Sequence, residues 1–198
     1  MRVILPCEFS GRVRRAFRAR GHDAWSCDLL PCEDGSPFHY QFDVRELFEG
    51  PVHQSFVLEG KELHWDLMIA FPPCTRLAVS GARWFRGKER EQAEAIEFVR
   101  KLMAVPVPRI CIENPVGVLS TAIRKPDQII QPWQFGHGET KATCLWLKEL
   151  PLLIPTKIVE GRAARVHREP PSPQRWKNRS RTYQGIADAM AEQWGRIT

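Results

Sequence analysis

Apolar runs that alternate with amphipathic stretches set the architecture that the sequence predicts. Short apolar runs, typical of buried strands, occur at 2–5, 24–27, 67–71, 109–112, 128–133 and 142–147. Between them, residues 13–20, 87–105 and 116–123 indicate helices, and Ile186, Met190 and Trp194 recur at helical spacing in a closing helix over 183–194. Strands alternating with helices predict an α/β fold, a mostly parallel sheet with helices on both faces.

Several of the predicted strands are followed directly by polar or unusual residues. In parallel α/β sheets, ligands bind at the carboxyl ends of the strands, so residues at these positions are expected to face one crevice. Five clusters qualify: Phe9-Ser10-Gly11, Asp28, Asp43, Pro72-Pro73-Cys74 and Glu113-Asn114-Pro115.

Cys74 and Glu113 are the candidates for chemistry. Pro72 and Pro73 stop an apolar strand, since proline cannot donate to a central sheet ladder, and leave Cys74 at the strand's end. Free cysteines are often merely buried, but a thiolate is also a strong nucleophile. Glu113 follows an apolar strand, where a carboxylate is costly unless it is used or paired; the alternative is a helix N-cap.

Composition narrows the class of protein. The chain has 198 residues, ordinary for one domain, a net charge of +6 and a pI near 9.2. Basic residues gather at 12–20, 83–90 and 162–181, which fits either a polyanionic partner or a surface kept basic for solubility.

The chain offers no sign of metal binding or membrane insertion. Its six cysteines lack CxxC pairs, and its six histidines lack paired ligand spacing, so no metal site is expected. No apolar run spans a bilayer and the N-terminal one is short for a secretory signal, so we expect a cytoplasmic protein without membrane contact. The pattern does not predict an oligomeric state.

Taken in order, the five clusters resemble the motifs of the cytosine-C5 DNA methyltransferases over nearly the whole chain. That family has a Phe-x-Gly turn after the first strand, acidic residues after the second and third, a Pro-Cys loop after the fourth and a Glu-Asn pair after the fifth. The resemblance implies a Rossmann-like class I methyltransferase fold and S-adenosyl-L-methionine as cofactor. The first turn is poorer in glycine than the family's, with Arg12, Val13 and Arg14 after Gly11.

The resemblance also implies roles for the site residues. Cys74 would add to carbon 6 of cytosine, and Glu113 would hold or protonate N3. Lys141 and Thr143 stand where the family has an Arg-x-Arg motif that contacts the target base, and they complete the catalytic set. In the cofactor site, the first turn would contact the methionine part, Asp28 the ribose and Asp43 the adenine amino group. The strand-end proline and the last motif would complete the site. The expected cofactor residues are Phe9, Ser10, Gly11, Asp28, Asp43, Pro72 and Thr182.

The segment 151–178 marks the largest departure from the family. Members that act on defined DNA sites carry a large target-recognition domain here, whereas this chain has a Pro-rich basic insert, expected to be mostly loop, between catalytic parts 1–150 and 179–198. Trp176 could stack on a base or anchor the loop to the core. Contacts with the phosphate backbone of DNA are expected from Arg162, Arg165, Arg168, Arg175 and Lys177.

Three functions follow from these observations. The leading hypothesis is methylation of cytosine carbon 5 in DNA through a covalent Cys74 adduct, with the base flipped out of the duplex and little sequence specificity. The same chemistry on a free cytosine nucleotide, RNA or a modified phage base is the second, and would suit a compact phage or prophage protein. The third is a catalytically silent, DNA-binding relative.

Overall fold

The centre of the molecule is a sheet of seven strands. The computed structural model describes residues 1–47, 56–58 and 61–197. The strand order is β3-β2-β1-β6-β7-β9-β8, and β4 and β5 form a separate antiparallel pair. The strands are β1 (Arg2–Pro6), β2 (Asp23–Asp28), β3 (His39–Gln41), β4 (Phe56–Leu58), β5 (Lys61–Leu63), β6 (Leu67–Ala70), β7 (Arg109–Pro115), β8 (Gln128–Ile130) and β9 (Thr143–Lys148).

The direction of the strands confirms a mostly parallel sheet. Strands β3, β2, β1, β6 and β7 pair in parallel, so their carboxyl ends share one edge. Strand β9 runs antiparallel between β7 and β8. Strands β1 and β6 are neighbours in the sheet but distant in sequence, because the strand order changes direction between them. Ligands bind at such a switch point in open α/β sheets.

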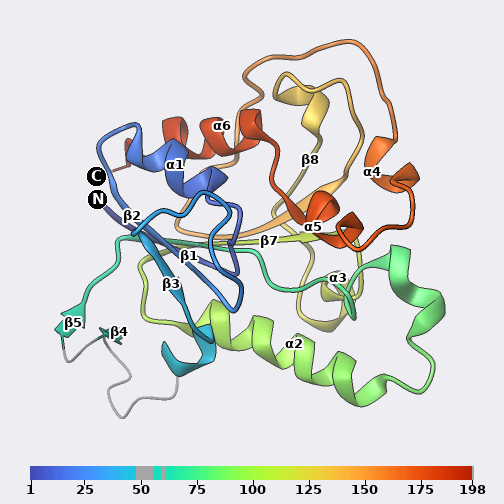
Figure 1. Cartoon of the computed structure of the whole chain (residues 1–198), viewed down its shortest axis with the longest axis horizontal. Coiled ribbons are helices and arrows are strands. Elements are labelled where there is room, and N and C mark those ends of the chain that lie inside the picture. Colours follow the sequence, from blue (N-terminus) through green and yellow to red (C-terminus); the bar gives the residue numbers. More distant parts are fainter. Residues whose placement is uncertain (48–55, 59–60, 198) are drawn as a thin grey trace.

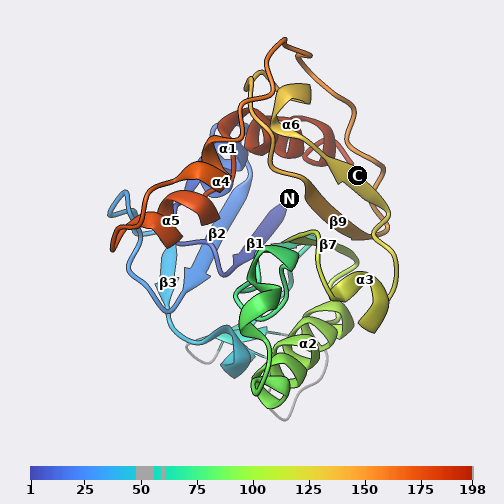
Figure 2. The same ribbon diagram turned by 90° about the vertical axis from the view of Figure 1, so that its right-hand side faces the viewer.

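Helices cover both faces of the sheet, as predicted (Figures 1 and 2). Helices α1 (Arg12–Arg18) and α6 (Gln184–Trp194) pack together on one face, and α2 (Glu89–Ala104) and α3 (Leu119–Ala122) lie on the other. No described helix is both long and apolar enough to cross a membrane. The remaining helices are short: η1 (Val44–Leu47), η2 (Val79–Trp84), η3 (Pro132–Gln134), α4 (Arg165–Arg168) and α5 (Arg175–Ser180).

Alternation along the strands divides the core into two layers. In β1, Val3 and Leu5 face the cluster beneath α1 and α6, whereas Ile4 faces the cluster over α2. All are at most 1% exposed. Because both faces are covered, the strands are continuously apolar rather than alternating in polarity, as the sequence shows.

The Pro-rich stretch 151–178 is less uniform than expected. It contains α4 and most of α5, although the rest lacks helix and long strand. Isolated parallel bridges pair Lys157 with Phe135 and Ala163 with Glu139, so the stretch lies alongside the loop that precedes β9 and runs in the same direction. This course brings α5 to the carboxyl edge of the sheet, where Arg179 and Ser180 meet residues that follow β1 and β6.

Candidate active site

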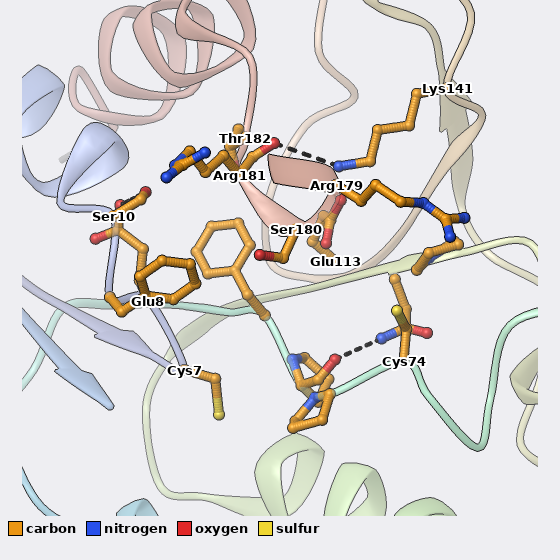
Figure 3. A pocket seen from close by; sticks show the side chains of 16 residues that line it. Cys7, Glu8, Ser10, Cys74, Glu113, Lys141, Arg179, Ser180, Arg181 and Thr182 are labelled. Carbon is orange, nitrogen blue, oxygen red and sulfur yellow. Dashed lines mark hydrogen bonds between the residues drawn. The ribbon is translucent and has the colours of Figure 1, made fainter. Parts of the chain in front are cut away.

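One pocket lies at the carboxyl edge of the sheet (Figure 3). Its empty volume is about 560 Å³ including the open mouth. Its walls come from the ends of β1, β6 and β7, from the loop before β9 and from the end of α5. The lining residues are Cys7, Glu8, Phe9, Ser10, Phe71, Pro72, Pro73, Cys74, Glu113, Asn114, Pro115, Lys141, Arg179, Ser180, Arg181 and Thr182.

The two candidate catalytic loops are joined by a buried hydrogen bond. Strands β6 and β7 are parallel neighbours, with Ala70 opposite Ile112, so the segments that follow them emerge side by side. The Asn114 side-chain N–H donates to the carbonyl of Pro72 over 2.8 Å, and Asn114 is 1% exposed. This bond fixes the Pro-Cys loop against the strand that carries Glu113. The sequence-based expectation that Cys74 and Glu113 share a crevice agrees with this geometry.

Burial and nearby charges determine the pKa of the Cys74 thiol. Burial raises the pKa of Cys74, and the carboxylate of Glu113 raises it further, whereas Lys141 and Arg179 lower it. Burial also raises the pKa of Glu113, and Lys141 opposes that shift. The thiol is therefore protonated near neutral pH, and protonation of Glu113 would favour the thiolate by removing the nearest negative charge.

Lys141 points into the pocket, but Thr143 does not line it. The Lys141 ammonium donates to the carbonyl of Arg181 over 3.3 Å and faces the same space as Cys74 and Glu113. Thr143 is 4% exposed, and its hydroxyl donates to the carbonyl of Lys141 over 3.1 Å. Thr143 opens the buried strand β9, so its hydroxyl is engaged by the backbone instead of being available to a ligand.

Arg179 is a pocket residue that the expected site did not contain. It is separated from Cys74 by most of the chain, and α5 carries it to the pocket beside Lys141. Its neighbours Arg181 and Thr182 are held by hydrogen bonds to other segments of the chain. Arg181 donates two hydrogen bonds to Glu33, over 2.9 and 2.6 Å, and Arg12 donates to the carbonyl of Thr182 over 2.9 Å.

Glu8 is the second residue that sequence reasoning missed. The backbone turns sharply after β1, with Cys7 at a φ of 61°, and places Glu8 in the pocket wall at 4% exposure. One carboxylate oxygen accepts from the amide of Val13 over 2.9 Å and from the hydroxyl of Ser10 over 3.3 Å, and the other has no partner. Burial raises the pKa of Glu8 to about 7.

The unpartnered oxygen of Glu8 fits a cofactor with a cationic end. An orphaned, buried carboxylate oxygen beside Ser10 would accept hydrogen bonds from an ammonium group, and both side chains line the pocket. Phe9, Pro72 and Thr182 line the same space, so four of the seven expected cofactor residues gather here.

The expected residues Asp28 and Asp43 lie outside this pocket's walls. Asp28 ends β2 and accepts from the amide of Leu30 over 2.9 Å, and burial raises its pKa. Asp43 pairs through both carboxylate oxygens with Arg45, which lowers its pKa. Both carboxylates raise the pKa of Cys7, so they lie near this pocket residue.

Gly11 also differs from expectation, because its open side is filled. Gly11 caps α1 with a φ of 66°, the left-handed region that favours glycine. A side chain there would meet the guanidinium of Arg14 and the carboxylate of Asp34. Arg14 is fully buried and holds Asp34 at 2.6 Å, so the loop after β2 folds onto the turn.

The expected phosphate-binding residues are spread over the basic stretch. Arg162 lies over the ring of Trp133 at 3.9 Å and donates to the carbonyl of Val159 over 2.8 Å. Arg165 is 3.9 Å from Glu139. The others are on or beside α4 and α5: Arg168, Arg175 and Lys177.

Comparison with known proteins supports the fold alone. No protein-family model matches the sequence, and no curated protein matches it. A solved structure with a similar fold is a candidate DNA modification methyltransferase encoded within a prophage of E. coli, with a TM-score of 0.52 and 14% identity. The alignment covers 81% of this chain and 52% of that one, so this chain spans about half the length of its structural neighbour. The chain thus shares the α/β, Rossmann-like fold of this neighbour.

Proposed function

We propose that this chain transfers a methyl group from S-adenosyl-L-methionine to carbon 5 of cytosine in DNA. The observation that carries the proposal is the pocket in which Cys74 and Glu113, from neighbouring parallel strands, face Lys141. The methyltransferase fold and the DNA-modifying description of its structural neighbour are consistent with it. In this proposal, residues 1–150 and 179–198 form the catalytic domain, and 151–178 the nucleic-acid-binding insert.

The chain's own residues suit addition of sulfur to a pyrimidine. The Cys74 thiolate would form a bond to carbon 6, which pushes the ring's electron pair toward N3 and makes carbon 5 enamine-like. Glu113, whose pKa is raised by burial, would in its protonated form donate its proton to N3 and so neutralise the developing charge. After methylation, a water molecule would take the carbon 5 proton, the carbon–sulfur bond would break with its electron pair returning to sulfur as the thiolate, and the N3 proton would return to Glu113.

The cofactor side of the pocket supplies the remaining requirement. S-Adenosyl-L-methionine, when bound, provides an electrophilic methyl group on a sulfonium. Glu8 and Ser10 would hold its ammonium end, and Phe9, Pro72 and Thr182 would enclose it. Lys141 and Arg179, which lower the pKa of Cys74, would stabilise the thiolate when it forms, and more strongly once substrate excludes water.

Transfer of tritium from labelled cofactor tests the proposal. Duplex DNA, single-stranded DNA, RNA and free cytosine nucleotides would be offered in parallel, and we expect label on carbon 5 of cytosine in DNA. Cys74→Ser should lower the rate at least roughly 10³-fold, as loss of a nucleophile does. Cys32→Ser, a thiol outside the pocket walls, is the matched control.

A trapping experiment isolates the covalent step. An oligonucleotide with 5-fluorocytosine keeps fluorine where a proton must leave, so an adduct that survives a denaturing gel is expected with wild type and absent with Cys74→Ser. Label on an exocyclic amine, or full activity of Cys74→Ser, would contradict the thiol mechanism. Label in no acceptor would favour the silent binding protein.

A further inference from the structure

Helix α5 forms part of the pocket mouth. Arg179 and Ser180 line the pocket, and the segment that follows is tied to the rest of the molecule by Arg181 and Glu33. Lys141 adds a tie to the carbonyl of Arg181. The end of α5 is therefore held at the pocket wall.

Trp176, on α5, is exposed at this position. It is 51% exposed and is the one aromatic residue among the large exposed hydrophobic side chains of the described chain. Its ring touches Phe9, with centroids 5.9 Å apart, and Phe9 lines the pocket. One part of the indole is thus anchored at the pocket wall, while the other half meets solvent.

The charges around Trp176 favour an anionic polymer. In the described stretch 162–181, salt bridges are formed by Arg165 and Arg181, whereas Arg175, Lys177 and Arg179 have no carboxylate partner within salt-bridge distance. The Lys177 ammonium is 5.5 Å from the Trp176 ring centroid, so a cation accompanies the exposed ring. An aromatic face bordered by uncompensated cations is the arrangement that binds unstacked nucleotides.

We infer that Trp176 stacks on the nucleobase that flanks the target base in DNA, with Lys177 facing the adjoining phosphate. The inference rests on the proposed function, because a target base drawn into the pocket leaves its neighbour without a stacking partner. The indole replaces that partner. Since every base offers a π-face, this contact would hold DNA without reading sequence, as expected of a chain without a recognition domain.

A thermodynamic cycle between protein and DNA tests the contact. The binding background is Cys74→Ser, and fluorescence anisotropy measures the affinity for oligonucleotides with an intact or an abasic neighbour on either side of the target cytosine. Trp176→Ala should weaken binding of intact DNA roughly 5- to 150-fold, the range of base–aromatic stacking. An abasic neighbour should weaken binding to a similar extent, and the combination should cost little more.

Two further variants keep the test specific. Trp176→Phe should restore part of the affinity, since it retains an aromatic face. Ile158→Ala removes another exposed hydrophobic side chain of the basic stretch, 68% exposed against 51% for Trp176, and should leave binding unchanged. Circular dichroism of each variant checks that the fold is intact.

The outcomes separate the inference from the proposed function. Additive effects of Trp176→Ala and the abasic neighbour would overturn the stacking contact. So would a Trp176→Ala protein that binds DNA normally but loses S-adenosylhomocysteine, because Trp176 would then cover the cofactor through Phe9. Non-additive binding in a protein that methylates nothing would support the contact and remove only the proposed function.

Discussion

The two ends of the pocket differ in how far their polar groups are already committed to partners. At the β6–β7 end, the hydrogen bond from Asn114 to Pro72 secures the loop, and Cys74 and Glu113 are left facing the cavity. Near the β1 end, Asp28 and Asp43 lie outside the pocket walls and accept hydrogen bonds from Leu30 and Arg45. Cys74 and Glu113 can therefore meet a ligand directly, whereas Asp28 and Asp43 would have to give up hydrogen bonds within the protein to bind one.

The turn after β1 extends this contrast. The buried Arg14–Asp34 pair occupies the space against Gly11 that a ligand could otherwise approach. Among the described residues at this end, Glu8 alone retains a buried side-chain oxygen without a hydrogen-bond partner. A ligand that must displace internal contacts binds more weakly than one that meets unpaired groups, so we expect modest cofactor affinity together with a well-organised catalytic end.

The largest expected effect comes from the preorganised end. Glu113→Gln removes the proton donor but keeps the shape, and turnover should fall roughly 10²- to 10⁴-fold, as for loss of a general acid. Because turnover needs both a protonated Glu113 and a thiolate, and the thiol is the weaker acid, wild-type activity should rise with pH and level off above the raised pKa of Glu113, whereas activity of the variant should go on rising as the thiol ionises. Steady-state rates between pH 5 and 9 measure both.

Cofactor binding provides the control for Glu113→Gln. Titration calorimetry with S-adenosylhomocysteine should give the same affinity as wild type, since Glu113 lies at the thiol end of the pocket. Glu97→Gln on the exposed side of α2 should leave the pH profile unaltered. A Glu113→Gln enzyme with wild-type turnover would show that the carboxyl is not the proton donor.

Glu8 gives the next largest effect, on stability. Its pKa rises from 4.5 to about 7 on folding, so between these pH values the folded protein holds a proton that the unfolded chain has released. Stability from this group is present below pH 4.5 and is lost as the pH rises toward 7, a change of about 3 kcal/mol. Glu8→Gln removes the titration, and urea unfolding at pH 4.5, 6 and 7.5 measures the difference from wild type.

The matched control for Glu8→Gln is Glu160→Gln, an exposed glutamate. Its stability should run parallel to wild type across the pH series. If the free energy of unfolding of Glu8→Gln also changes with pH as that of the wild type does, the Glu8 carboxyl is not buried as described. Cofactor affinity should fall in Glu8→Gln, since a neutral amide holds an ammonium group less strongly than a carboxylate does.

The residues at the β6–β7 end of the pocket were predictable because the sequence features that mark them are local. Apolar runs ended by Pro72 or followed by Glu113 mark strand ends, and a parallel sheet brings such ends together. The same reasoning applies to Glu8, a carboxylate directly after the apolar first strand, and would have identified it. The bounds of the strands and helices shifted by only a few residues from the predicted ones.

The remaining features depend on tertiary contacts that no spacing rule contains. Arg179 reaches the pocket because the basic stretch lies alongside the loop before β9. Thr143 turns its hydroxyl to the backbone because β9 is buried between β7 and β8. Asp43 accepts hydrogen bonds from Arg45, and its position in a motif does not predict which side chain it pairs with.

The smallest expected effect concerns the Asp43–Arg45 pair. If Asp43 meets the adenine amino group, Arg45 competes for its carboxylate, and Arg45→Ala should tighten binding of S-adenosylhomocysteine. The pair is accessible, with the Arg45 side chain 60% exposed, so the gain is roughly two- to fivefold, the scale of an exposed ion pair. Asp43→Asn should weaken binding instead, and calorimetry at low salt resolves both changes. Equal affinities in the two variants would exclude Asp43 from the cofactor site and restrict that site to the Glu8 end of the pocket.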